Sequence, residues 1–494
     1  MKKRMNVDRR RFLRTAGAAA LAPAVGRAAG SGANEQIRVA VIGLGTRGPA
    51  IAWNLLKIPD VELVAICDAD TERMDDFEKK LSKDPKAGRG VKKVQDFRKV
   101  MDDPEIDAVM ICTPNHWHAH MTLMACEAGK DAMVEKPVCH TIWEGWRMME
   151  AAKKHGRIIT GGFQNRGDSG LIRFFDYLES ESQPVGKLES VNALWHRFRE
   201  SIGKRKSPLK PPASVDYNLW LGPAMDEPIY REKFHYDWHW MWNTGSGEMG
   251  NLGAHNLDIA RWAIGDPKDK PVRVLSAGNR FVWDDAGETP NMHWARYDFG
   301  NGIPFTVEVR DLNLKPDVKR LAGFKGISSG MILKYEGGEF RGGRGGGKLY
   351  GNDNKVIEKF AGDGGKDHLV SFFNAVRSRN ESDLRCKLED AVYSSQCVLM
   401  GGLATRIGSP ATPDDISKVM SGEPKAVQGM WEHMGEHLEN WDIDYAKEPW
   451  MLGPELTYDW KAQHFSAASE PAALAKAQAL HQRSYREAFP FPKV

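Results

Sequence analysis

The chain has 494 residues, of which 41% are hydrophobic and 27% are charged, and its formal net charge is +3. These values exclude a wholly disordered, collagen-like or disulfide-scaffold protein, and the length suggests two or three domains. The first 33 residues hold eight Lys or Arg and one Asp, a net of +7, so the remainder carries −4. A mildly acidic protein has no electrostatic reason to bind nucleic acid.

Residues 1–33 resemble a twin-arginine export signal. The stretch DRRRFLR at 8–14 precedes an apolar, alanine-rich run that is too short to span a bilayer. Small-x-small patterns at 31–33 and at 22–24 are the two candidate cleavage sites. The alternative is a disordered basic tail. The resemblance implies a partner in the twin-arginine export machinery and a soluble, periplasmic mature protein with no membrane span.

A dinucleotide-binding pattern follows. A β-branched run at 37–42 leads directly into the glycine loop Gly43-Leu-Gly45-Thr46-Arg47-Gly48, and a helical pattern then leads to a second strand at 61–66. This order is typical of a Rossmann unit, in which the helix N-terminus offers free N–H groups to the phosphates. Asp68 follows Gly48 by 20 residues, where a carboxylate binds a ribose 2′-hydroxyl and repels a 2′-phosphate. The pattern therefore predicts NAD, with NADP less favoured.

The alternation of strands and helices continues to about residue 160. Further strands are expected at 106–112, 131–134 and 158–162, with helices between them, so a doubly wound parallel sheet is predicted. Ligands of such sheets bind at the carboxyl ends of the strands. This places Thr113, Asn115, Glu135 and Lys136 along one crevice with the glycine loop.

Three motifs in this part resemble the Gfo/Idh/MocA family of oxidoreductases: GLGTRG, TPNHWHA and EKP, in that order. Two later stretches, VDYNLWLGPA and GSGEMGNLGAHNLDIARW, extend the resemblance over residues 36–410. It implies an N-terminal Rossmann domain (36–160), a C-terminal α/β domain with a large open, mostly antiparallel sheet (161–410), and an unmatched extension (411–494). The sheet is expected to form the floor of the substrate site and the interface between subunits of a homo-oligomer. The resemblance implies cofactor contacts from Gly43, Gly45, Thr46, Arg47, Gly48, Asp68, Thr113, Asn115, His118, Glu135 and Lys136.

The sequence of the second domain has strand patterns with few helical patterns between them. Strands are expected at 188–195, 272–275, 294–299 and 303–309, with a hairpin turn at 300–302 and one long helix at 254–263. The glycine-rich tract 337–347 is interpreted as a mobile loop. The pattern of apolar residues at 367–407 predicts a pair of helices. The tryptophan-rich extension, with an amphipathic stretch at 471–488, is expected to be an ordered arm over a neighbouring domain or subunit.

His255 and Lys136 are the candidate catalytic residues. The family pattern is Asp-x-x-x-His, and this chain has Asn251 where the Asp would be, which puts the proton route in doubt. Asp258, three residues after His255, is interpreted as a structural carboxylate. The resemblance implies that Lys136 contacts both the cofactor and a substrate hydroxyl, where an ammonium would stabilise a developing alkoxide.

Substrate contacts are expected from planar polar groups and aromatic faces, which suit carbohydrate. The candidates are Gln164, Arg166, Asp237, Trp238, Asn251 and His255. The histidines at 116–120 and the HxxEH pattern at 433–437 could suggest a metal, but neither has a convincing ligand set, so no metal is expected.

The sequence thus predicts an NAD-dependent oxidoreductase that transfers a hydride between nicotinamide and a hydroxyl of a sugar, glycoside or polyol. Two alternatives stay open. One keeps the cofactor in a redox-neutral cycle, as a glycosidase, a lyase or a hydride-shuttling enzyme. The other is a carbohydrate-binding protein without catalysis.

Overall fold

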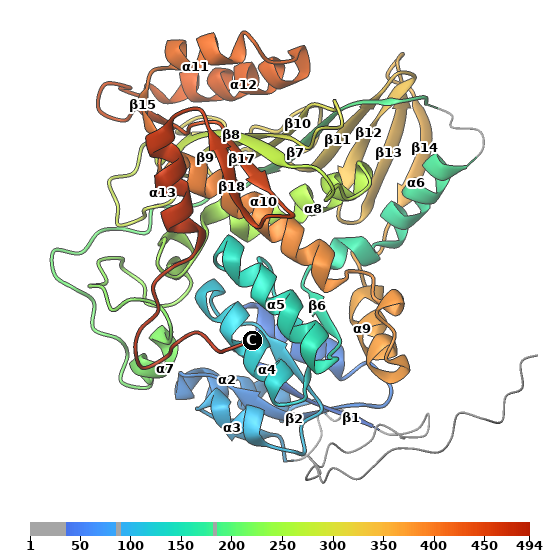
Figure 1. The fold of residues 1–494 in the computed structure, drawn as a ribbon, viewed down its shortest axis with the longest axis vertical. Helices are drawn as coiled ribbons and strands as arrows, with labels where there is room; N and C mark the ends of the chain where they lie inside the picture. Colours follow the sequence, from blue (N-terminus) through green and yellow to red (C-terminus); the bar gives the residue numbers. More distant parts are fainter. Residues whose placement is uncertain (1–35, 85–89, 181–184) are drawn as a thin grey trace, which may run out of the picture. The chain divides into compact units, whose positions relative to one another are not determined.

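The computed structural model describes residues 36–84, 90–180 and 185–494 (Figure 1). The expected export signal lies outside the described residues. The first domain contains a six-stranded, wholly parallel sheet in the order β3-β2-β1-β4-β5-β6. Its strands are β1 (Ile37–Ile42), β2 (Val61–Cys67), β3 (Lys92–Val94), β4 (Ala108–Ile111), β5 (Asp131–Val134) and β6 (Ile159–Gly161). The predicted Rossmann sheet is confirmed, and its strand order reverses between β1 and β4, where ligands bind in such folds.

The central strands are buried on both faces, which explains their continuous apolar sequences. The covering helices are α1 (Arg47–Leu55), α2 (Thr71–Leu81), α3 (Phe97–Asp102), α4 (His118–Glu127) and α5 (Ile142–His155). Helix α5 begins with a capping box in which Thr141 and Glu144 satisfy each other's backbone N–H groups, and it ends at Gly156 in the left-handed region.

The second domain is built on a twelve-stranded sheet. Ten strands follow the order β14-β13-β12-β11-β7-β10-β9-β8-β16-β15, and β17 pairs with both β8 and β18. All these pairs are antiparallel except β7 with β10. The strands are β7 (Leu188–His196), β8 (Val272–Asn279), β9 (Met292–Asp298), β10 (Phe305–Arg310), β11 (Ser329–Tyr335), β12 (Gly338–Gly343), β13 (Gly346–Gly351), β14 (Val356–Ala361), β15 (Ser409–Ala411), β16 (Trp450–Leu452), β17 (Leu456–Asp459) and β18 (His464–Ala468). The expected large, mostly antiparallel sheet is confirmed.

Two helices of the second domain lie between the sheets: α8 packs on β7 and β11, and α10 contacts both β8 and α5 (Figure 1). The helices are α6 (Ser169–Glu179), α7 (Tyr217–Leu221), α8 (Ala254–Ala263), α9 (Asp367–Ser378), α10 (Leu388–Arg406), α11 (Pro413–Met420), α12 (Lys425–Leu438) and α13 (Pro471–His481). Phe372 and Phe373 of α9 join the apolar core of the first domain. The two domains therefore share buried surface.

The interpretation of residues 337–347 as a mobile loop is wrong. They form the hairpin of β12 and β13, with Gly345 and Gly346 at φ +92° and +90° in the turn. A Cβ on Gly342 would lie 2.5 Å from the Gly346 carbonyl oxygen. Glycines are needed here because the backbones of the two strands approach too closely for side chains. The prediction failed because a glycine-rich composition is also typical of mobile loops.

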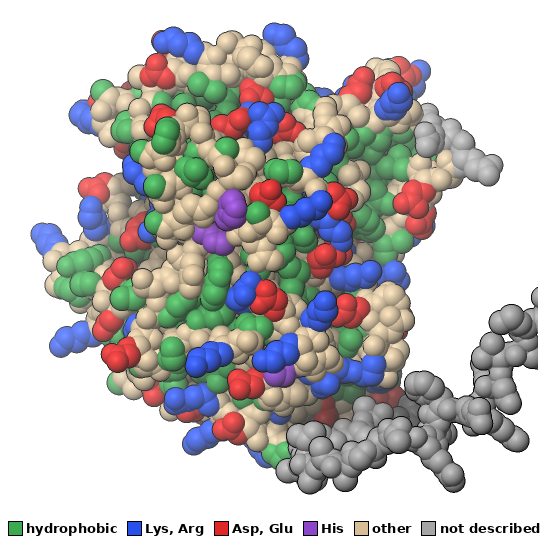
Figure 2. Space-filling model, viewed as in Figure 1, with side chains coloured by type: hydrophobic (Ala, Val, Ile, Leu, Met, Phe, Trp, Pro, Cys, Tyr) green, Lys and Arg blue, Asp and Glu red, His purple; other side chains and the backbone are tan. Residues whose placement is uncertain are grey.

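The extension 411–494 is part of the fold. Strands β16 and β17 pair with β8, and Trp450 and Tyr458 are almost fully buried. The chain then crosses back to the first domain, where Phe489 packs edge-on against Trp117. Within the described residues, no helix is long and apolar enough to cross a membrane. On the face drawn in Figure 2, basic and acidic side chains are interspersed.

Candidate active site

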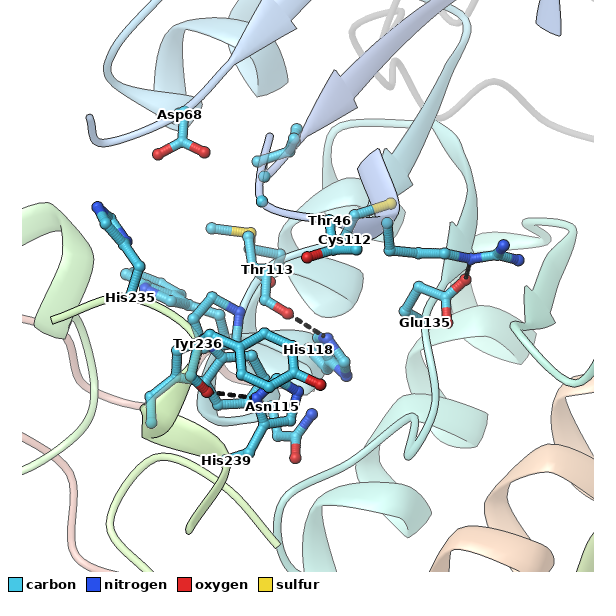
Figure 3. A pocket seen from close by; sticks show the side chains of 18 of the residues that line it. Thr46, Asp68, Cys112, Thr113, Asn115, His118, Glu135, His235, Tyr236 and His239 are labelled. Carbon is cyan, nitrogen blue, oxygen red and sulfur yellow. Dashed lines mark hydrogen bonds and ion pairs between the residues drawn. The ribbon is translucent and has the colours of Figure 1, made fainter. Parts of the chain in front are cut away.

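A cavity of about 350 Å³ lies at the carboxyl ends of β1, β4 and β5 (Figure 3). Besides the strand ends, its lining includes the glycine loop, residues 112–121, parts of the segment from Leu219 to His255, and Arg344 at the tip of the β12–β13 hairpin. Of the seventeen residues predicted to bind the cofactor or substrate or to act in catalysis, fourteen line this cavity: Gly43, Gly45, Thr46, Arg47, Asp68, Thr113, Asn115, His118, Glu135, Lys136, Gln164, Trp238, Asn251 and His255.

 The other three are Gly48, which is buried in the first turn of α1, and Arg166 and Asp237.

The glycine loop owes its shape to two of its three glycines. Gly43 has φ +93°, and a Cβ there would lie 2.5 Å from the Cys112 carbonyl oxygen. A Cβ on Gly48 would lie 1.9 Å from the Gly43 carbonyl oxygen. At Gly45, by contrast, the nearest atom to a Cβ is 3.6 Å away, on the Arg73 side chain, so this glycine leaves space in the cavity itself. That is the position where a phosphate group would approach the backbone.

Asp68 is held at the end of β2 by two backbone donors. Its Oδ2 accepts from Leu44 N at 2.6 Å and its Oδ1 accepts from Asp70 N at 2.9 Å. Burial raises the pKa of Asp68, and these hydrogen bonds partly offset that effect. The carboxylate therefore faces the glycine loop, as a ribose-binding acid should. Arg73 also lines this end of the cavity.

The Thr113–His118 segment forms the middle of the cavity (Figure 3). The His118 ring lies between two carbonyl oxygens, with Nε2 at 2.9 Å from Thr113 O and Nδ1 at 2.7 Å from Pro137 O. Asn115 accepts a hydrogen bond from Ser246 Oγ at 2.9 Å. The Thr113 hydroxyl is buried and has no partner within the described part of the chain. It is thus free to bind a ligand.

Glu135 is paired with the glycine loop. Arg47 Nε donates to Glu135 Oε1 at 2.6 Å. Burial alone would raise the pKa of Glu135, but Arg47 and Lys136 outweigh it, so the pKa is lowered. Glu135 is therefore a fixed, ionised partner of Arg47, and the structure shows it in contact with this arginine.

Lys136 reaches across to the second domain. Its Nζ donates to the Asn251 main-chain oxygen, and Asn251 Oδ1 lies 3.3 Å away. Burial lowers the pKa of Lys136 to about 8, against the opposing effects of the Glu135 and Glu248 carboxylates. A lysine with such a pKa changes its charge in the physiological range, which is a common property of functional sites.

His255 lies at the same end of the cavity, at the start of α8. Its side chain is 8% exposed, and its Nδ1 has no hydrogen-bond partner among the described residues. Burial, followed by the positive charges of Lys136, Arg47 and Arg344, lowers its pKa well below 6.5. The ring is therefore neutral at neutral pH and can accept a proton.

Two of the predicted substrate residues lie elsewhere. Arg166 is buried against the Asp258 and Asp266 carboxylates, with N···O distances of 2.8 and 2.7 Å, so it is a structural cation and does not reach the cavity. The same pair gives Asp258 the structural role that was expected. Asp237 is buried beside the cavity without lining it. Both assignments depended on nearness in sequence to residues that do face the cavity.

Several lining residues were not predicted as site residues: Arg73, Cys112, His235, Tyr236, His239 and Arg344. His235 Nε2 lies 2.9 Å from Asp70 Oδ2, and the His239 ring stacks on Trp238 with centroids 3.6 Å apart. The nearness of His235, Tyr236 and His239 to Trp238 in the sequence could have indicated that they belong to the site. Nothing in the sequence indicated this for Arg344, because it lies in the glycine tract that was interpreted as a loop.

In both histidine patterns, ring nitrogens contact backbone carbonyl oxygens. The His116 ring faces the Thr244 and Trp220 carbonyl oxygens at 3.3 and 3.1 Å. His437 Nε2 lies 2.6 Å from the Asn313 carbonyl oxygen. Over residues 36–84, 90–180 and 185–494, no group of three or more His, Cys, Asp or Glu side chains could hold a metal ion.

Comparison with known families agrees with this geometry. The profile described as "Oxidoreductase family, NAD-binding Rossmann fold" matches residues 37–163, and the one described as "Oxidoreductase family, C-terminal alpha/beta domain" matches residues 190–319. Both belong to the Gfo/Idh/MocA family, and together they span more than half of the chain. The chain belongs to this family of oxidoreductases.

Individual relatives match over part of their length. Myo-inositol 2-dehydrogenase of Thermotoga maritima is 32% identical over 52% of this chain and 63% of its own. A glycosyl hydrolase family 109 protein of Shewanella pealeana is 30% identical over 30% of this chain and 38% of its own. These curated relatives are thus matched over less than two thirds of their length. A solved levoglucosan dehydrogenase, in complex with NADH and levoglucosan, superposes with a TM-score of 0.53 over 75% of this chain and 98% of that chain, at 17% identity, which shows a shared fold.

Gly45 and Gly48 of the loop allow a paired test. We expect Gly48→Ala to lower the free energy of unfolding by about 2 kcal/mol or more, because its Cβ meets backbone. Gly45→Ala should leave stability near the wild-type value and weaken NAD binding at least tenfold, about 1.4 kcal/mol. Denaturant titration and calorimetry with NAD measure the two effects. Equal loss of stability in both variants would contradict the separation.

Proposed function

We propose that this protein is an NAD-dependent oxidoreductase that transfers a hydride between nicotinamide and a hydroxyl-bearing carbon of a sugar, glycoside or polyol. The observation that carries the proposal is that Lys136 and His255 line one cavity with the glycine loop, and that His255 Nδ1 has no hydrogen-bond partner among the described residues. When bound, the nicotinamide supplies the hydride acceptor. The names of the dehydrogenase relatives support the choice of substrate class.

The two side chains have complementary tasks. His255, which is neutral and whose Nδ1 has no hydrogen-bond partner in the described chain, takes the proton of the substrate hydroxyl as the carbon is oxidised. Lys136, as an ammonium, stabilises the negative charge that develops on the oxygen. Gln164, whose Oε1 is also buried without a partner in the described chain, and the Trp238 ring offer contacts to a sugar.

The pKa of Lys136 predicts the pH dependence of oxidation. Since its ammonium is lost as pH rises through about 8, kcat/KM should fall above that pH. Lys136→Arg should abolish this fall, because a guanidinium stays charged, and His255→Ala should lower turnover roughly 10²-fold. Lys130→Arg, at the opposite end of β5, is the control and should keep the wild-type profile. Activity that rises through pH 8 would instead make Lys136 the base.

We also propose that NAD is preferred over NADP, because the Asp68 carboxylate would repel a 2′-phosphate. NAD should bind at least tenfold more tightly, about 1.4 kcal/mol. Asp68→Ser should remove most of this preference, since the repelling carboxylate is lost and Arg73 remains available to bind the 2′-phosphate of NADP. Glu72→Gln, an exposed neighbour, removes the same charge and should change nothing. Calorimetry of each variant with both cofactors measures the ratio, and an NADP preference in the wild type refutes the proposal.

We further propose that the protein is exported through the twin-arginine pathway with its cofactor in place, and that its net reaction is redox-neutral. Outside the cytoplasm there is little NAD to exchange with. The segment around residues 214–235 supports retention, because it crosses the nucleotide end of the cavity: Thr71 N donates to Ser214 O at 3.1 Å and His235 contacts Asp70. A redox-neutral cycle would either pass hydride between two sugars or return it to the same one, as in a glycosidase.

Retention of NAD can be tested directly. We expect full-length protein, purified without added nucleotide and dialysed, to release about one equivalent of nicotinamide cofactor per chain when denatured. Mass spectrometry identifies the cofactor, and a sugar panel watched at the nicotinamide absorbance reports turnover. Protein that emerges empty and needs added NAD for every turnover would favour an ordinary dissociable dehydrogenase.

A further inference from the structure

Among the described residues, the Lys136 ammonium forms no ion pair with a carboxylate. The adjacent Glu135 is engaged with Arg47, and the groups that Lys136 contacts directly are an amide and a carbonyl oxygen, both of Asn251. Burial of such a cation favours its neutral form. Two carboxylates beyond its direct contacts, Glu135 and Glu248, favour the charged form.

A continuous chain of contacts leads from Asn251 to a buried carboxylate. Asn251 Nδ2 donates to Glu248 Oε2 at 3.2 Å. Glu248 also accepts from Arg199 Nη2, with distances of 3.0 Å to Oε1 and 3.2 Å to Oε2, and its side chain is fully buried. Glu248 lies immediately before the π-helical turn Met249–Gly253, which carries Asn251.

The carboxylate fixes the direction of the amide. An ionised Glu248 can only accept hydrogen bonds, so it must face the NH₂ group of Asn251. The amide oxygen is then turned towards Lys136. A neutral group at 248 could accept or donate, and the amide could turn over and present its NH₂ group to the ammonium.

We propose that Glu248 is a positioning residue for Lys136, which orients the Asn251 amide and keeps the lysine ammonium charged through it. This deepens the proposed function, on which its catalytic meaning rests. Other charged or titratable groups act on the same ammonium: Glu135, which favours it, Arg47 and Arg199, which oppose it, and the neutral rings of His118, His239 and His255. Among these, Glu248 is the carboxylate connected to Lys136 by side-chain hydrogen bonds.

The experiment measures the pKa of Lys136 in the full-length protein as purified, from the pH dependence of its acetylation by acetic anhydride, followed by mass spectrometry. Glu248→Gln should lower this pKa by about one pH unit or more, because an opposite charge is removed. The fall of kcat/KM at high pH should move by the same amount. The double variant Glu248→Gln with Asn251→Asp should restore the pKa to the wild-type value or above, since it returns one carboxylate to the chain.

One variant serves as a control and another as a second test. The control is Glu288→Gln, which alters a carboxyl group bonded to Trp242 N, away from Lys136, Asn251 and Glu248, and it should leave the pKa of Lys136 unchanged. Asn251→Leu keeps the Glu248–Arg199 pair and removes the bridging amide, so it should lower the pKa of Lys136. If Glu248→Gln does not fold, Asn251→Leu decides the question.

An unchanged pKa of Lys136 in folded Glu248→Gln or, failing that, in Asn251→Leu would overturn the proposal. Failure of the double variant to restore the pKa would also overturn it. The acetylation measurement needs no sugar. A shifted pKa in a protein that oxidises none of the sugars tested would therefore retain this inference and refute the proposed function.

Discussion

Burial of charge in pairs is the constraint on which the cavity depends. Several charged side chains lie buried or half-buried at the carboxyl end of the parallel sheet, where an unpaired charge is costly. Arg47 is matched by Glu135 and Arg199 by Glu248. These pairs leave Lys136 as a cation whose direct contacts are neutral, with the Glu248 carboxylate behind the Asn251 amide.

The second domain holds its part of the site by the same means. Arg166, at the start of that domain, bonds Asp258 of α8 and Asp266 after it, and Asp258 also accepts from Ser394 of α10. Removing one member of a buried network of this kind typically costs about 3–5 kcal/mol. The network therefore anchors α8, and with it His255, against the rest of the protein.

The sequence was most informative where local pattern and chemistry coincide. The glycine loop, Asp68 and the strand ends carrying Thr113 and Lys136 could be predicted because a parallel sheet brings its carboxyl ends to one edge. Arg166 and Arg344 could not. Whether an arginine faces a cavity or a carboxylate depends on partners about a hundred residues away, such as Asp258 and Asp266, and a glycine tract is a hairpin or a loop according to the strands beside it.

The extension beyond the family match stabilises the part within it. Glu144 is fully buried, and both of its oxygens are used: Oε2 accepts from His140 N and Thr141 N in the cap of α5, and Oε1 accepts from Arg483 and Tyr485 of the C-terminal tail. Arg483 also donates to the His116 carbonyl oxygen at 2.6 Å. His116 lies in the segment that positions Thr113 and His118 in the cavity. The tail thus supplies Arg483, the cation that pairs with the buried Glu144 carboxylate. Through Arg483, the last residues of the chain also fix the backbone beside the active site.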